Sequence, residues 1–101
     1  MKAEFTVFED ADGYWFVPRS EENAAIADPS SYRVCVHSTK IAACRVALLQ
    51  AIDTGATELH LHGCGSTTSI KREATSSGVK PFIYWPSITT RIAPFVRAKK
   101  A

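Results

Sequence analysis

The chain has 101 residues, of which 46% are hydrophobic and 22% charged, and its formal net charge is +2. This length suits one domain with a core of its own, and the composition excludes a disordered or low-complexity protein. No apolar run is long enough to cross a membrane and the first residues do not form a signal peptide, so we expect a cytoplasmic protein without membrane contact. Three cysteines at wide spacing do not form a disulfide framework, and we expect them to be reduced.

The charges are distributed unevenly along the chain. Residues 1–31 carry seven acidic and two basic side chains, whereas residues 32–101 carry three acidic and ten basic ones. This split points either to an anionic partner for the basic part or to a mixed surface that happened to sort this way. Charge alone does not decide between the two.

The first half of the chain has the alternating pattern of β-strands. Residues 1–18 predict a β-hairpin with an acidic, Gly-containing turn at residues 10–13, and Pro18 ends its second strand. Residues 19–31 predict a polar loop with a short helical turn at residues 21–27. The β-rich, alternating residues 32–37 predict a third strand.

In the second half of the chain, the spacing of apolar residues changes from that of a strand to that of a helix. Apolar residues three and four apart predict a helix over residues 39–54, which packs on the sheet through Ile41, Leu48 and Ile52 and ends before Gly55. Residues 58–62 return to strand alternation, so residues 32–62 form a predicted βαβ unit with parallel strands. Residues 63–78 predict a Gly/Ser/Thr loop and a short helix at 69–75. Residues 79–101 predict a strand at 80–85 and a basic tail that is helical in its first half.

Together these elements predict a single α+β domain. An N-terminal β-hairpin, the βαβ unit and a further strand form one mixed sheet, with the main helix packed on one face.

Strand periodicity places His60, His62 and Cys64 on one face of the predicted strand at 58–62. On the strand at 32–37, Cys35 and His37 would share that face, and such side chains can ligate zinc, nickel or copper. No CxxC or HExxH spacing is present, and Cys and His also fill half-buried positions as ordinary core residues. We therefore expect no bound metal and no cofactor.

Cys64 could also act as a nucleophile with His62 or His37 as its base. The cysteine-to-arginine spacing of a phosphatase loop is absent, because the first arginine after Cys64 is Arg72. We expect no catalytic residue and no enzymatic activity.

The loop from Gly63 to residue 69 lies where a strand gives way to a helix. Glycines let a phosphate approach the backbone closely, and amide and hydroxyl groups can donate to its oxygens. The loop matches neither GxxxxGK[ST] nor GxGxxG, so a nucleotide site is not expected. Contact with nucleic-acid phosphates needs less geometry, and for it we expect Lys40, Gly63, Gly65, Lys71, Arg72, Arg91 and Arg97.

Residues 32–74 resemble the Alba superfamily of small nucleic-acid-binding proteins. The resemblance rests on Lys40 before the helix, on the helix end at Gly55, on Glu58 at the strand entry and on Gly63 and Gly65 in the following loop. It implies binding of DNA or RNA with little sequence preference. The chain departs from the family in its polar, short second helix and in carrying its hairpin at the N-terminus, which puts the family's dimerisation and groove-binding arms in doubt.

A protein-interaction module is the alternative. Small α+β chains with an acidic hairpin and exposed aromatic residues are typical of modulators from phages and other mobile elements, including inhibitors of host defence proteins. Tyr14, Trp15 and Trp85 are the residues expected at such an interface, since Tyr and Trp anchor many interfaces. A homodimer would also cover these aromatic residues and the free strand edges.

Overall fold

The computed structural model describes residues 1–65, 68–87 and 90 of the chain. It confirms an α+β fold with one mixed sheet, in which the strands follow the order β2-β1-β3-β4. Along the chain the elements are β1 (Lys2–Asp10), β2 (Gly13–Pro18), the 3₁₀ turn η1 (Arg19–Glu21), α1 (Glu22–Ala27), α2 (Pro29–Tyr32), α3 (Lys40–Asp53), β3 (Glu58–His62), α4 (Thr68–Ser76) and β4 (Lys80–Ile83). None of the helices in these residues is long and apolar enough to span a membrane.

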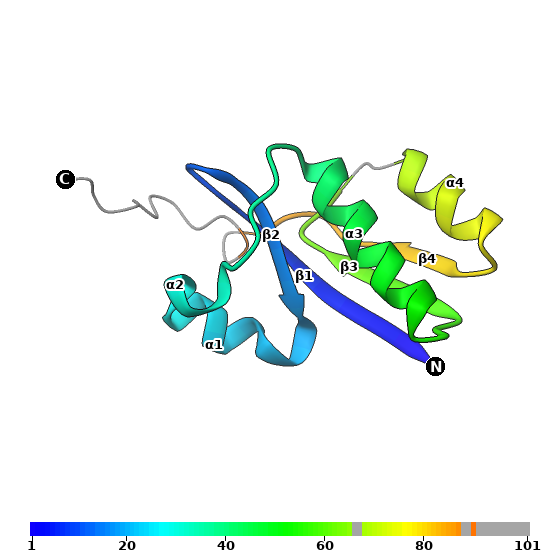
Figure 1. Cartoon of the computed structure of the whole chain (residues 1–101), viewed down its shortest axis with the longest axis horizontal. Helices are drawn as coiled ribbons and strands as arrows, with labels where there is room; N and C mark the ends of the chain where they lie inside the picture. Colours follow the sequence, from blue (N-terminus) through cyan, green and yellow to red (C-terminus); the bar gives the residue numbers. More distant parts are fainter. Residues whose placement is uncertain (66–67, 88–89, 91–101) are drawn as a thin grey trace.

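The sheet combines a local hairpin with long-range parallel pairing. β1 pairs antiparallel with β2, as the hairpin pattern predicted, and parallel with β3, so that Phe5 lies opposite Leu61. β3 pairs parallel with β4 through α4, which supplies a βαβ unit at residues 58–83. α3 and α4 lie over the same face of the sheet (Figure 1).

The main helix α3 begins and ends as its sequence predicted. Thr39 Oγ1 accepts a hydrogen bond from the Ala42 amide at 3.2 Å, and Gly55 follows the last turn with a φ of +77°. Both are standard ends, because the cap satisfies a free amide and glycine tolerates a positive φ.

The face through which α3 packs differs in part from the prediction. Leu48 is 2% exposed and Ile41 is half-buried, but Ile52 is 38% exposed and points away from the core. The contact with the sheet is made largely by small side chains, since Ala43, Ala47 and Ala51 are fully buried. Alanines four apart line one face of a helix and let it approach the strands closely.

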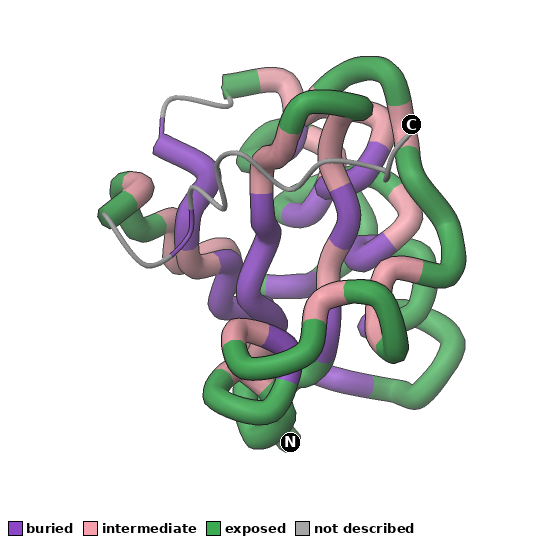
Figure 2. The backbone as a smooth tube through the Cα atoms, turned by 90° about the vertical axis from the view of Figure 1, so that its left-hand side faces the viewer, coloured by how far each residue is buried: buried purple, intermediate pink, exposed green. Residues whose placement is uncertain are grey.

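The core lies on both sides of the hairpin. Phe5, Val7, Leu59 and Leu61 pack against α3 and α4 on one face of the sheet. On the other face, Phe8, Trp15 and Val17 form a second cluster with Ala25 of α1. Buried residues accordingly follow the middle of the strands, while the outer turns are exposed (Figure 2).

The prediction of a strand at residues 32–37 is wrong. α2 occupies its start, and only His37 bridges to the sheet, through two backbone hydrogen bonds of 2.8 and 2.7 Å with Tyr14. The physical reason is the side chain of Arg33, which turns to Asp10 and Asp12 instead of alternating along an edge strand. The parallel neighbours of β3 are instead β1 and β4, so the βαβ unit predicted at residues 32–62 is not formed.

We expect Leu48→Ala to lower the free energy of unfolding by about 2–5 kcal/mol, because it removes a large buried side chain beside the sheet. Leu49→Ala is the matched control, since Leu49 is 57% exposed on the same helix. Its effect should stay within about 0.5 kcal/mol in urea-induced unfolding. Equal losses for both variants would contradict the assigned helix face.

Candidate functional site

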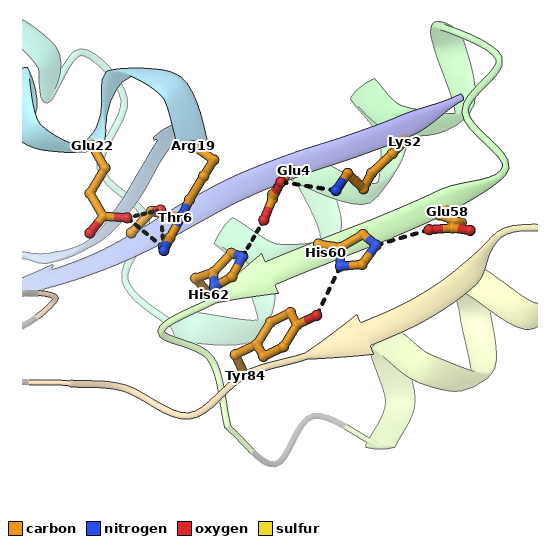
Figure 3. A network of polar contacts seen from close by, with 9 residues as sticks. All are labelled: Lys2, Glu4, Thr6, Arg19, Glu22, Glu58, His60, His62 and Tyr84. Atoms are coloured by element: carbon orange, nitrogen blue, oxygen red, sulfur yellow. Dashed lines mark hydrogen bonds and ion pairs between the residues drawn. The ribbon is translucent and has the colours of Figure 1, made fainter.

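The sheet face opposite α3 and α4 carries the even-numbered residues of β1 and β3. Over β3 and β4, no helix from the described part of the chain packs on this face (Figure 3). Two histidines and two further aromatic residues are arranged there side by side. We refer to this surface, made of His60, His62, Phe82 and Tyr84, as the open face.

The four rings form a ladder across β3 and β4. The register places His60 opposite Phe82, and their rings stack with centroids 4.4 Å apart and planes at 8°. His62 and Tyr84 stack in the same way at 4.3 Å and 6°, and His60 lies 5.9 Å from Tyr84 at 15°. Cross-strand neighbours hold the rings parallel, so the ladder is a preformed aromatic surface.

Polar contacts fix both histidines in this ladder. His60 Nε2 lies 3.0 Å from Glu58 Oε1, and His62 Nε2 lies 2.6 Å from Glu4 Oε2 (Figure 3). Because an ionised carboxylate only accepts, each Nε2 carries the proton and donates it. In neutral His60 the second nitrogen, Nδ1, then accepts the hydroxyl of Tyr84 at 3.0 Å.

The two carboxylates are held in their charged form. Burial raises the pKa of Glu4, but the hydrogen bond from His62 and the charge of Lys2 outweigh it, and the net pKa is lowered. The hydrogen bond from His60 lowers the pKa of Glu58, with smaller contributions from nearby charges that include Lys2 and Lys80. Both side chains therefore remain acceptors for the histidines at neutral pH.

Basic side chains border the ladder. Lys80 Nζ lies 5.5 Å from the centre of the Phe82 ring, and Lys2 Nζ lies 3.7 Å from Glu4 Oε1. Arg19 contacts Thr6 Oγ1 at 3.4 Å on the same side of β1. The open face thus combines planar rings with cations at its border.

The contacts of the open face suit binding better than catalysis. Tyr84, His60 and Glu58 follow the order of nucleophile, base and orienting carboxylate, but Tyr84 is 40% exposed on a sheet surface that does not enclose a substrate. Within residues 1–65, 68–87 and 90, no three His, Cys, Asp or Glu side chains gather so as to hold a metal. The predicted common face of histidines and cysteines is wrong for Cys64, which is buried on the helix side.

The loop after β3 is closed around a backbone carbonyl. The amides of Gly63, Cys64 and Gly65 all donate to the Tyr84 carbonyl oxygen, at 3.1, 2.9 and 3.1 Å. A Cβ at Gly63 would collide with the Val7 carbonyl oxygen, and one at Gly65 would lie 2.6 Å from the Trp85 ring. Close packing thus requires both glycines, and their amides bind Tyr84 where the sequence predicted phosphate contacts.

The structure brings one predicted basic residue to this loop. Lys40 Nζ donates to the Cys64 carbonyl oxygen at 3.0 Å and lies 6.0 Å from the Tyr14 ring centre, so the helix start and the loop share one end of the sheet. Lys71 and Arg72 are exposed on α4. The predicted contacts Arg91 and Arg97 lie outside the described residues, as does the helix predicted for the tail.

The hairpin does not present its aromatic residues as predicted. Trp15 is 1% exposed and stacks on Phe8 at 4.7 Å, so it belongs to the core and its assignment to an interface is wrong. Tyr14 is half-buried, with its hydroxyl 3.4 Å from Glu9 Oε2. Of the three predicted interface residues, Trp85 is the exposed one, at 74%.

The acidic turn of the hairpin is bound by Arg33 of the same chain. Asp10 accepts from Trp15 Nε1 at 2.8 Å, from Arg33 Nε at 2.6 Å and from the Asp12 amide at 2.8 Å. Arg33 also lies 2.9 Å from Asp12 Oδ2. The turn therefore organises the fold through Asp10 and Arg33, while Asp12 remains exposed.

An apolar surface runs along the outer side of α3. A hollow of about 450 Å³ is lined by Val46, Leu49, Gln50, Ile52 and Asp53. A second hollow of about 310 Å³ shares two of these residues and extends to β2 and the segment after α2, where it is lined by Phe16, Pro18, Val34, Cys35, His37, Val46 and Gln50. Leu49 at 57% and Val34 at 90% are unusually exposed for apolar side chains.

Comparisons of the chain with protein-family models, with curated proteins and with solved structures found no match. The resemblance to the Alba superfamily stays a hypothesis from the sequence.

Only part of the open face was predicted from the sequence. The alternation of His60 and His62 was predicted, but Phe82 and Tyr84 were not predicted to lie beside them. The signal that could have found them is the matching alternation of aromatic residues in the strand at 80–85, once that strand is paired with β3.

The buried carboxylate of Asp10 yields a pH-dependent prediction. Burial raises the pKa of Asp10, but hydrogen bonds from Arg33, the Asp12 amide and Trp15 lower it more, so the net pKa lies below the ordinary value of 3.8. A lowered pKa stabilises the fold above pH 4, and this contribution is lost as the pH falls through the lowered value.

Asp10→Asn should therefore lower the free energy of unfolding by about 3 kcal/mol at pH 7, since it leaves the mostly buried Arg33 with a weaker partner. The difference from the unchanged protein should shrink below pH 4 in urea unfolding. Asp53→Asn, which changes an exposed carboxylate, is the control and should stay within about 0.5 kcal/mol. A pH-independent difference for Asp10→Asn would contradict the pKa assignment.

Proposed function

We propose that this protein binds single-stranded nucleic acid on its open face, with little sequence preference. The observation that carries the proposal is the ladder of four parallel rings on a sheet surface that no described helix covers. Unpaired bases stack on such rings whatever their identity, and each stacked base contributes about 1–3 kcal/mol. A non-enzymatic role agrees with a surface that does not enclose a substrate.

Tyr84 is the ring best placed to receive a base. It is 40% exposed and directly follows β4, the strand at one edge of the sheet. Its ring is held between two parallel neighbours, His62 at 4.3 Å and His60 at 5.9 Å. A base stacked on the exposed part of this ring would join a stack that the protein has already ordered, so little conformational entropy is lost on binding.

Phosphate contacts would come from the cations around the ladder. Lys2 and Lys80 lie on the open face beside the rings, whereas Lys71 and Arg72 are exposed on the neighbouring helix α4. The acidic side chains of this face, Glu4 and Glu58, are engaged by the two histidines. Lys2, 3.7 Å from Glu4, offsets part of the negative charge that a phosphate would meet there.

The decisive test compares two substitutions at Tyr84. Tyr84→Leu should weaken binding of a fluorescent 20-nucleotide oligo(dT) or oligo(U) about tenfold, because one stacked base is lost. Tyr84→Phe keeps the ring and should remain within about twofold. Fluorescence anisotropy at low salt measures both affinities.

The charge contribution is tested separately through salt. Changing Lys2 and Lys80 together to Gln should flatten the log–log dependence of affinity on salt by about one to two units, as expected for two lost phosphate contacts. Changing the more distant Lys71 and Arg72 shows whether α4 also takes part. If the unchanged protein binds neither single-stranded DNA nor RNA at low salt, the proposal is wrong.

A protein-interaction module is the second candidate, and the apolar outer surface of α3 favours it. Because Leu49 lies in the larger hollow, a photoreactive amino acid placed at position 49 would cross-link to a bound protein partner. The same amino acid at position 71, on the exposed side of α4, is the control. Cross-links to one protein from position 49 alone, together with absent nucleic-acid binding, would favour this candidate.

A further inference from the structure

The two buried cysteines meet where α3 passes the end of β3. Cys44 Sγ and Cys64 Sγ lie 2.9 Å apart, and the two residues are 0% and 1% exposed. This separation is only about 0.9 Å longer than an S–S bond of about 2.05 Å. We infer that Cys44 and Cys64 are a site of reversible oxidation, at which a disulfide joins α3 to the loop after β3.

The surroundings of the pair favour a thiolate on Cys44. The ammonium group of Lys40 is held beside the pair by its 3.0 Å hydrogen bond to the Cys64 carbonyl oxygen, and a nearby cation stabilises a thiolate. The hydrogen bond from Cys64 lowers the pKa of Cys44, whereas that same bond and burial raise the pKa of Cys64. Cys44 is therefore the attacking group and Cys64 the resolving one.

The oxidant is a low-molecular-weight disulfide such as oxidised glutathione. The Cys44 thiolate attacks one of its sulfurs, forms a mixed disulfide and releases one thiolate. Cys64 then loses its proton, and its sulfur attacks Cys44 Sγ and displaces the second external thiol. The two cysteines have lost two electrons and two protons, and the external disulfide has been reduced to two thiols.

Burial of both thiols controls the rate of this reaction. The oxidant reaches Cys44 only when the contact between α3 and the loop opens, whereas Cys35 is exposed and reacts at the surface. The fully formed pair would cross-link residues 20 positions apart, between α3 and a loop whose amides hold the Tyr84 carbonyl. Such a cross-link should raise the Tm by about 10 °C or more.

The experiment uses the full chain treated with oxidised glutathione without denaturant, then blocked with N-ethylmaleimide and cut with trypsin. The cut sites place each cysteine in its own peptide: residues 34–40 hold Cys35, residues 41–45 hold Cys44 and residues 46–71 hold Cys64. Mass spectrometry should find peptides 41–45 and 46–71 joined, two hydrogens lighter than their sum, and separated again by a reductant.

Cysteine variants supply the controls. Cys35→Ser should keep both the cross-link and the rise in Tm, whereas Cys44→Ala and Cys64→Ala should lose both. In the Cys35→Ser background, Lys40→Gln should slow the oxidation several-fold and Lys40→Arg should not, as judged by the loss of free thiols with time.

Three results would overturn the inference. The first is glutathione on Cys35 with Cys44 and Cys64 still free, and the second is a cross-link that includes Cys35. The third is a Cys44–Cys64 bond that forms only after denaturant has unfolded the chain. Each is read from the same peptide map of the unchanged protein, so the conclusion does not depend on whether a variant folds.

Discussion

A single acceptor, the carbonyl oxygen of Tyr84, holds the ends of β3 and β4 together. Three successive amides converge on it, which is possible only because Gly63 and Gly65 adopt positive φ values of 89° and 71°. The sharp turn brings Cys64 back under α3 and leaves the Tyr84 ring beside His62. The loop, the buried thiol pair and the aromatic ladder therefore share one point of attachment.

The same strands present an apolar surface on one face of the sheet and an aromatic, hydrogen-bonded surface on the other. On one face, alternate residues of β1 and β3 such as Phe5 and Leu61 bury apolar surface against α3 and α4. On the other, the histidines of β3 are flat enough to stack on Phe82 and Tyr84, yet polar enough to donate hydrogen bonds to carboxylates. His60 is buried inside the ladder while Tyr84 stays 40% exposed, so the face presents planar ring surface that an aliphatic strand face could not offer.

Local signals predicted most of the elements from the sequence. The hairpin turn, the cap and glycine stop of α3, the alternation of β3 and the short α4 each depend on neighbouring residues, and all are present in the structure. The prediction of a strand at residues 32–37 was wrong because the conformation of this segment depends on a contact between Arg33 and Asp10, which is 23 residues away in the chain. The spacing of apolar residues along the sequence does not reveal such a long-range contact.

The same distinction applies to the site. Strand alternation placed His60 and His62 on one face correctly, but it also placed Cys64 there, because the positive φ of Gly63 interrupts the alternation just before it. Trp15 was expected at the surface, yet a cluster with Phe8 and α1 covers it on the second face of the hairpin. A backbone turn decides the first outcome and packing against α1 decides the second, and the alternation within one strand encodes neither.

The central position of β1 has a consequence for how the chain folds during its synthesis. β1 leaves the ribosome before the other strands and can pair with β2 as soon as β2 follows, but its other neighbour starts at Glu58, which lies opposite Lys2 in the register. At about 5–20 residues per second, those 56 residues take roughly 3–11 seconds to add. Until then Phe5 and Val7 lack their partners on β3, so folding completes late and the nascent hairpin needs protection from aggregation in the meantime.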